Sequence, residues 1–175
     1  YYIVKEILKR TLVRMLICCV IALLFCITGN AKVPYIPKII NYSVSDYKAG
    51  NQNWAVSQGP GGKMYIGNNR GLLVFDGIHW DLVKLPNNLG VRALYISKDG
   101  RIYVGSFEEF GYFEMDDEHD LIYHSLSSSE MNVYLNNDEF WTINEYKGEI
   151  YFQSFRSFFI YDGEKVRKGV SDLSP

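Results

Sequence analysis

From about residue 53 onward, short apolar segments alternate with turns rich in glycine and asparagine, and this pattern occurs three times. In the first copy the turn 59–62 leads into the apolar segment 63–67, and the turn 68–71 leads into a second apolar segment, 72–75. Glycine in turns permits positive φ angles, and short segments rich in tyrosine, phenylalanine and valine predict β-strands. The pattern therefore predicts antiparallel strands joined by tight turns.

Three tyrosines mark equivalent places in the three copies: Tyr65, Tyr103 and Tyr151, which are 38 and 48 residues apart. Four short strands in a unit of roughly 40 residues are typical of one β-propeller blade. The longer second interval leaves room for a surface loop at 127–138. We therefore expect three blades with strands at 53–58, 63–67, 72–75 and 78–83, then 91–96, 101–105, 110–114 and 121–126, then 140–144, 149–153, 158–161 and 166–168.

The predicted fold class is all-β: a partial β-propeller of about three four-stranded blades, preceded by an N-terminal hydrophobic signal or anchor helix. No segment after residue 33 sustains the apolar period of a helix, which excludes a helical repeat. A propeller closes with about 4 to 8 blades, so three blades form an open arc. We interpret the chain as a fragment of a longer protein or as a mis-called open reading frame, because it starts at Tyr1 and ends at Pro175, soon after a predicted strand.

The N-terminal region has the three parts of a secretory signal peptide. Residues 1–14 are basic, residues 15–27 carry no charge, and small residues follow at Gly29 and Ala31. This uncharged stretch is shorter than the roughly 20 residues that a membrane-spanning helix needs. We therefore predict that residues 1–32 form a signal peptide or membrane anchor that exports the chain to the periplasm, with cleavage favoured over retention.

Residues 33–52 are predicted to lead into the blades, which occupy residues 53–175. The segment 38–44 is apolar enough to form one strand. A lone strand ahead of the first blade could close the ring by pairing within the last blade.

Charge and cysteine content restrict the function classes. From Val33 onward the chain has 13 basic and 19 acidic side chains, a net charge of −6. It also lacks a basic stripe, so we expect no nucleic-acid partner for this fragment. The three cysteines, Cys18, Cys19 and Cys26, all lie in the N-terminal apolar stretch. The blades therefore have no cysteine for a disulfide or a thiolate metal site.

Motifs of enzymes and cofactor sites are missing or incomplete. The sequence 59–63 is similar to a phosphate-binding loop, but Met64 stands where that loop has its Mg²⁺-binding Ser or Thr. The acidic segment 114–120 lacks the turn glycine of a Ca²⁺ loop, and His119 and His124 have no third metal ligand nearby. We therefore predict no catalytic residue, no metal site and no cofactor in this chain.

The strongest candidates for ligand binding lie on one rim of the predicted propeller. The loops that enter the first strand of each blade share this rim with the loops that join its second and third strands. Amides, guanidinium groups and aromatic rings there suit hydrogen bonding and stacking against a polar ligand such as an oligosaccharide. Trp54 and Trp141 open strands and could instead pack between blades, and Arg70 could only order its turn. The candidate residues are Asn68, Asn69, Arg70, Arg92, Phe107, Glu108, Trp141 and Arg156.

Two stretches carry a recognisable sequence across their turns and strands. The first is DYKAGNQNW at 46–54 followed by MYIGNNRGLL at 64–73, and the second is VRAL at 91–94 followed by DGRIYVG at 99–105. They resemble the first blades of the two-component regulator propeller family, and the resemblance covers nearly all of the chain after the N-terminal apolar stretch. The third copy departs from the family pattern, because Gln153 replaces the glycine that follows the second strand.

Proteins of this family are periplasmic sensor regions of membrane-spanning hybrid histidine kinases and of related helix-turn-helix transcription regulators. The resemblance implies further blades, a β-sandwich stalk, a transmembrane helix and a cytoplasmic output domain. For this fragment it implies a share in sensing an extracellular solute or in homodimer contacts of the full-length protein, and no enzyme activity.

Two alternatives stay open. One is a secreted propeller enzyme acting on polysaccharide, with Glu108 and Glu109 as the suggestive carboxylate pair; the other is a structural or protein-binding propeller.

Overall fold

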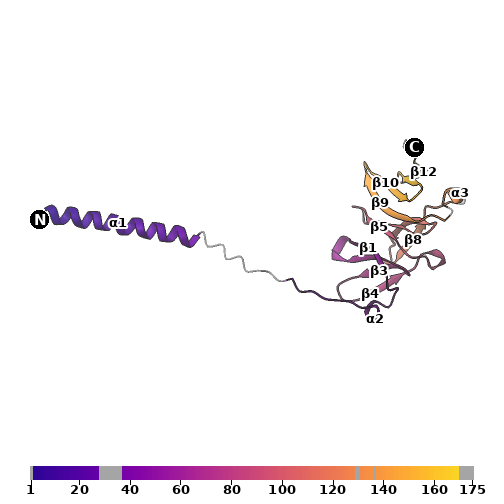
Figure 1. Cartoon of the computed structure of the whole chain (residues 1–175), viewed down its shortest axis with the longest axis horizontal. Helices are drawn as coiled ribbons and strands as arrows, with labels where there is room; N and C mark the ends of the chain where they lie inside the picture. The colour runs from indigo at the N-terminus through magenta and orange to yellow at the C-terminus, as the bar shows by residue number, and fades with distance from the viewer. Residues whose placement is uncertain (1, 28–36, 129–130, 136, 170–175) are drawn as a thin grey trace. The chain divides into compact units, whose positions relative to one another are not determined.

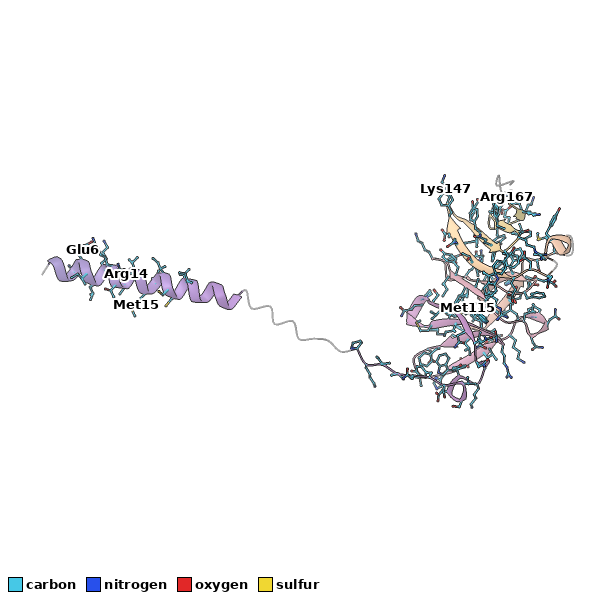
Figure 2. The ribbon with its side chains drawn as sticks, in the orientation of Figure 1. Glu6, Arg14, Met15, Met115, Lys147 and Arg167 are labelled. Carbon is cyan, nitrogen blue, oxygen red and sulfur yellow. The ribbon has the colours of Figure 1, made fainter. Side chains whose placement is uncertain are left out.

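The computed structural model describes residues 2–27, 37–128, 131–135 and 137–169, which belong to two units, Tyr1–Ile40 and Asn41–Pro175. In the first unit the helix α1 spans Tyr2–Ile27 (Figure 1), and side chains such as Glu6, Arg14 and Met15 project from its surface (Figure 2). The predicted N-terminal helix is therefore present. Among the described residues no helix is both long and apolar enough to cross a membrane, so the anchor half of the prediction has no support. Gly29 and Ala31, predicted to lie near the cleavage site, fall outside the described residues.

The second unit contains three four-stranded antiparallel sheets, each with neighbouring strands in chain order (Figure 1). Each sheet is one of the predicted blades, and its strand ends agree with the expected ones to within two residues. The strands are β1 (Asn53–Gln58), β2 (Met64–Asn68), β3 (Gly71–Phe75) and β4 (Trp80–Val83) in blade 1; β5 (Ala93–Ile96), β6 (Ile102–Gly105), β7 (Phe110–Met115) and β8 (Leu121–Ser125) in blade 2; and β9 (Phe140–Tyr146), β10 (Glu149–Ser154), β11 (Phe158–Tyr161) and β12 (Val166–Lys168) in blade 3.

Short helical turns lie in the connections between strands. The turn η1 (Pro60–Gly62) lies between β1 and β2, and η2 (Pro86–Asn88) lies between blades 1 and 2. The short helix α3 (Asn132–Leu135) lies in the connection expected to be a surface loop, and it buries the Leu135 side chain in the core between blades 2 and 3.

The apolar core between blades 2 and 3 is built around Phe110 of β7. Its side chain is fully buried. Its ring centroid lies 4.7 Å from those of Phe140 and Phe152 and 5.3 Å from that of Phe159, all in blade 3. A single four-stranded sheet cannot bury both of its faces, so stacking of neighbouring blades supplies the core.

Equivalent backbone hydrogen bonds join consecutive blades. The Val91 N–H donates to the carbonyl oxygen of Asn68 at 2.9 Å, and the Phe140 N–H donates to that of Ser106 at 3.0 Å. Each bond holds the start of one blade against the end of the second strand in the preceding blade. The inner strands β1, β5 and β9 therefore lie next to one another, as strands that line a propeller channel do.

Gly67 and Gly105 occupy equivalent places beside these bonds. A Cβ atom on Gly105 would lie 2.7 Å from the Cβ of Phe140, and one on Gly67 would lie 2.9 Å from the Cγ1 of Val91. Each glycine lets the following blade approach the second strand closely. Close packing of the next blade therefore explains the glycine that recurs in the first two sequence copies. Gln153, at the same place in the third copy, is exposed.

We expect the substitution Gly105→Ala to lower the unfolding free energy by about 1–2 kcal/mol, because the added methyl group overpacks the contact with Phe140. Urea unfolding followed by circular dichroism measures this loss. The control is Gly61→Asn: nothing lies within 4 Å of the Cβ position at Gly61, its φ is +70°, and asparagine tolerates that conformation. Equal losses in the two variants would contradict the packing argument.

The lead-in segment covers one face of blade 1. Tyr47 and Ala49 are buried against Ile66 and Leu73. The neighbouring Tyr65 belongs to the core between blades 1 and 2, and successive residues of a strand point to opposite faces. The lead-in segment therefore covers the face of blade 1 that points away from blade 2.

The strand predicted at 38–44 is not formed in any part of that segment. Residues 37–43 form no strand, and Val44 begins the helical turn α2 (Val44–Tyr47). The carboxylate of Asp46 accepts the Ser43 N–H at 2.6 Å, and this local bond favours a helical turn over an extended chain. Closure of the ring by this segment stays a prediction, because it concerns the last blade.

The turn that follows β3 is held by the Asp76 carboxylate. Its Oδ1 accepts the N–H groups of His79 at 2.7 Å and Ile78 at 2.8 Å. The backbone bonds from His79 and Ile78 lower the pKa of Asp76 from 3.8 to about 2. The equivalent Asp162 of blade 3 accepts two backbone N–H groups in the same way.

We expect this turn to lose stability in acid. A carboxyl whose pKa is lower in the folded state contributes stability above its unfolded value, and that contribution disappears as pH falls. The window for Asp76 therefore runs from about pH 4 down to about pH 2. Melting temperatures measured across this window should fall less steeply in Asp76→Asn than in the unmodified chain. Identical slopes would contradict the role of the carboxylate.

Candidate functional site

One residue at the start of each inner strand occupies an equivalent position: Trp54 in blade 1, Arg92 in blade 2 and Trp141 in blade 3. In each blade the next residue pairs with an equivalent residue of the second strand. The strand register shifts at Trp54 and at Trp141, so both are the extra residues of β-bulges. Bulges redirect side chains and are common next to functional sites.

The Trp54 side chain contacts both of the others across the blades. The guanidinium carbon of Arg92 lies 4.5 Å from the ring centroid of Trp54. The rings of Trp54 and Trp141 meet edge to face, with centroids 5.7 Å apart. Phe155, from the turn between β10 and β11, lies 5.6 Å from Trp141. Three blades thus place one aromatic and cationic surface at one end of the inner strands.

Hydrogen bonds hold this surface in place. The indole N–H of Trp54 and Nη1 of Arg92 donate to the same oxygen, Oδ1 of Asn69, at 2.6 and 2.5 Å. The Asn69 amide donates to Gln52 at 2.7 Å. Nε of Arg92 donates to Glu139 at 3.0 Å, and only 22% and 24% of these two side chains are exposed. We call the following residues the rim cluster: Trp54, Asn69, Arg92, Glu139, Trp141 and Phe155.

The rim cluster presents aromatic surface together with polar groups. Trp54 is 41% exposed and Phe155 is 80% exposed. The indole N–H of Trp141 is buried and has no hydrogen-bond partner among the described residues. An exposed aromatic face beside fixed amide, guanidinium and carboxylate groups can stack against a flat ring and hydrogen-bond to its polar substituents.

The structure brings three of the eight predicted rim residues, Asn69, Arg92 and Trp141, into the rim cluster. Asn68 is fully buried, and its side-chain amide forms hydrogen bonds with backbone groups of Gly50 and Gln52. It therefore braces the lead-in segment and offers no surface to a ligand.

Of the other four predicted residues, Arg70 and Arg156 lie in the same turns as Asn69 and Phe155, whereas Phe107 and Glu108 lie in the connection between β6 and β7. Phe107 is 39% exposed and forms an isolated bridge with Glu139. Glu108 accepts the backbone N–H of Asn137 at 2.5 Å. Arg70 and Arg156 are exposed. Ligand contact by any of these residues stays a prediction.

The carboxylates that suggested an enzyme are both engaged in local structure. Glu109 accepts hydroxyl hydrogen bonds from Tyr123 at 2.8 Å and from Ser125 and Ser127 at 2.7 Å. Burial and the nearby Glu109 raise the pKa of Tyr123. Because Glu108 is held by Asn137, neither carboxylate is placed as a free acid or base.

Three members of the rim cluster, Trp54, Glu139 and Phe155, are not among the eight residues predicted from the sequence. Glu139 lies 47 residues from Arg92 in the sequence, and no local sequence pattern predicts an ion pair over that separation. Trp54 could have been identified from the repeat, because Trp54 and Arg92 each lie 11 residues before the marker tyrosine of their blade and Trp141 lies 10 before its own.

No protein-family model matches the chain, and no curated protein matches it. Solved structures do match. One is the extracellular domain of a one-component system from B. thetaiotaomicron, at 12% identity and a TM-score of 0.61, covering 77% of this chain and 19% of that one. Another is the extracellular domain of a hybrid two-component system from the same organism, at 20% identity and a TM-score of 0.53, covering 78% of this chain and 18% of that one. A third is virginiamycin B lyase from Staphylococcus aureus, at 17% identity and a TM-score of 0.56, covering 78% and 46%.

The chain thus spans about a fifth of the length of the extracellular domains that it matches. At sequence identities of 12–20%, the structural similarity to these proteins shows the fold alone. The matched extracellular domains come from the class of signalling protein that the sequence resemblance indicates. With three four-stranded blades in an arc, the chain has the β-propeller fold that it shares with extracellular domains of bacterial one- and two-component systems.

Proposed function

We propose that this chain forms the first blades of a periplasmic sensor propeller and that its rim cluster binds an extracellular oligosaccharide. The observation that carries the proposal is the convergence of Trp54, Arg92 and Trp141, one equivalent position from each blade, on a single surface. A ligand seated there contacts several blades at once, which suits a sensor whose blades respond together.

An oligosaccharide fits the chemistry of this surface better than an apolar ligand does. Sugar rings offer apolar faces that stack on tryptophan and phenylalanine, and their hydroxyl groups pair with amides and charged side chains. Asn69, Arg92 and Glu139 supply such groups, already oriented by the bonds that they make with one another. Pre-oriented polar groups reduce the entropy that binding costs.

Signal transduction would then depend on parts outside this chain. A sensor of the resembled family needs a membrane-spanning helix and a cytoplasmic kinase or DNA-binding domain downstream, and α1 would export the propeller. Translation of the genomic DNA that follows the codon for Pro175 tests this proposal. A stop codon directly after a completed ring would contradict it.

Ligand binding is tested by calorimetric titration of the 175-residue chain with trisaccharide fragments of starch, cellulose, xylan and pectin. We expect one of these to bind, and Trp141→Ala to weaken its binding at least about tenfold, because a buried aromatic anchor is worth more than about 1.4 kcal/mol. Tyr146→Ala is the matched control, since Tyr146 is an exposed aromatic residue at the other end of the same strand, β9. Absence of binding to every fragment, or equal effects of the two substitutions, would contradict the proposal.

A further inference from the structure

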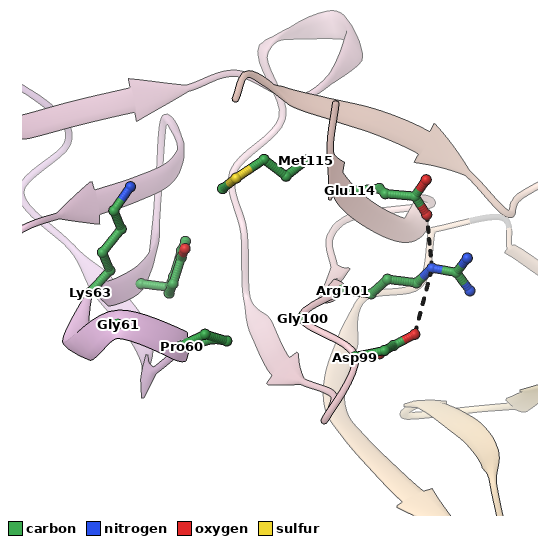
Figure 3. A pocket seen from close by; sticks show the side chains of 9 residues that line it. Pro60, Gly61, Lys63, Asp99, Gly100, Arg101, Glu114 and Met115 are labelled. Atoms are coloured by element: carbon green, nitrogen blue, oxygen red, sulfur yellow. Dashed lines mark hydrogen bonds and ion pairs between the residues drawn. The ribbon is translucent and has the colours of Figure 1, made fainter. Parts of the chain in front are cut away.

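A cleft lies between blades 1 and 2, at the end of the inner strands opposite the rim cluster (Figure 3). It measures about 720 Å³, within the range of small-molecule sites. The hairpin turn between β1 and β2 forms one wall, and the turn between β5 and β6 together with the end of β7 forms the other. Its lining residues are Pro60, Gly61, Lys63 and Tyr65 from blade 1, and Asp99, Gly100, Arg101, Glu114 and Met115 from blade 2.

The two walls carry opposite charge. On blade 2, Nε of Arg101 lies 2.8 Å from a carboxylate oxygen of Glu114 and 3.9 Å from one of Asp99. Two carboxylates share one guanidinium, so this wall has an excess negative charge. On blade 1, Lys63 has no ion-pair partner among the described residues. Figure 3 shows the Lys63 side chain across the cleft from the Arg101, Glu114 and Asp99 side chains.

Apolar groups lie between these charged walls. The aromatic side chain of Tyr65 lines the cleft, and burial raises the pKa of its hydroxyl group, so it stays neutral. Met115 also lines the cleft and is 44% exposed. Figure 3 shows its thioether projecting into the space between Lys63 and Glu114. The cleft therefore combines one cationic end, one anionic end and an apolar middle.

The corresponding cleft between blades 2 and 3 is much smaller, at about 280 Å³. Its lining includes Tyr103 and Tyr161, whose ring centroids lie 6.4 Å apart. Glu145, also in its lining, accepts the hydroxyl hydrogen bond of Tyr95 at 2.7 Å. The cleft between blades 2 and 3 therefore leaves less room for a ligand than the cleft beside Lys63 does.

We propose that the cleft between blades 1 and 2 binds a small zwitterion of the size and chemistry of an apolar amino acid. The ligand carboxylate pairs with Lys63, its ammonium group lies against Asp99 and Glu114, and its apolar side chain contacts Tyr65 and Met115. Each charged end meets a side chain of opposite charge, and neither charge of the ligand is left unpaired. This site is independent of the rim cluster and of the function proposed for it.

The test uses the whole chain with its methionines labelled by ¹³C in the methyl group, titrated with L-leucine, L-methionine and L-phenylalanine. We expect at least one of these amino acids to shift the Met115 signal and leave the Met131 signal unchanged. The N-acetyl derivative and the amide of the same amino acid each lack one charge. We expect each to bind at least about tenfold more weakly, since a hydrogen bond to a charged group is worth about 1.5–3 kcal/mol.

Substitutions locate the site. Lys63→Gln should weaken amino-acid binding at least about tenfold, whereas Lys84→Gln, at another exposed lysine of blade 1, should leave it unchanged. Trp141→Ala should also leave it unchanged, which separates this site from the rim cluster. The proposal is overturned if no amino acid shifts the Met115 signal, if the N-acetyl derivative and the amide bind as tightly as the amino acid, or if Lys63→Gln and Lys84→Gln behave alike.

Discussion

Replacing Phe110 by alanine is expected to lower the unfolding free energy by about 3–5 kcal/mol, the usual cost of truncating a buried phenylalanine. Phe110 has no exposed surface, and its ring lies among those of Phe140, Phe152 and Phe159 of the next blade. The cavity would therefore open between two blades. We expect blade 3 to separate from blade 2 at lower denaturant concentration than in the unmodified chain.

Urea unfolding of Phe110→Ala and of Phe155→Ala measures this effect with a matched control. Phe155 is 80% exposed, so its truncation should change the unfolding free energy by no more than about 0.5 kcal/mol. If Phe110→Ala does not fold at all, Phe110→Leu provides a smaller and measurable loss. Equal stability of the Phe110 and Phe155 variants would contradict the stacked-blade core.

Replacing Arg92 by methionine is expected to lower the unfolding free energy by about 2–3 kcal/mol. The substitution leaves Glu139 without its cation and Asn69 without one donor. The expected loss is smaller than the roughly 3–5 kcal/mol for a fully buried pair, because solvent reaches part of both side chains. Methionine preserves most of the length and the apolar contact with Trp54.

A double-mutant cycle separates the ion pair from other effects of this substitution. Glu139→Gln removes the uncompensated charge, so Arg92→Met should cost less in its presence, with a coupling energy of about 0.5–3 kcal/mol. Arg156→Met is the control, because Arg156 is exposed and makes no ion pair among the described residues. Additive losses for Arg92→Met and Glu139→Gln would mean that this contact does not organise the rim.

The blades could be predicted from sequence because each depends on local signals. Alternating apolar residues and glycine turns specify each hairpin through residues that lie within about ten positions of one another in the sequence. The marker tyrosines Tyr65, Tyr103 and Tyr151 indicate the length of the repeat. The recurring glycines Gly67 and Gly105 also indicate a close contact between blades, although the sequence does not identify the residues that contact them. The fold class therefore depends on local sequence patterns alone.

The rim cluster and the lead-in segment could be predicted only in part, because both depend on longer-range contacts. Arg92 is fixed by Glu139, from another blade, and the bulges at Trp54 and Trp141 follow from strand register, which composition does not reveal. In the lead-in segment, the local bond between Ser43 and Asp46 overrides an apolar run that otherwise favours a strand.

The central claim is that equivalent residues of the blades build one ligand-binding rim, and the three tryptophans of the chain allow a direct test. Trp54 and Trp141 belong to the rim cluster, whereas Trp80 stacks on Phe75 at the outer strand of blade 1. The measurement is the ¹⁵N-indole NMR spectrum of the whole chain during titration with the trisaccharide panel. We predict that the Trp54 and Trp141 signals shift together while the Trp80 signal stays in place; no shift with any trisaccharide, or a shift of Trp80 alone, would contradict the claim.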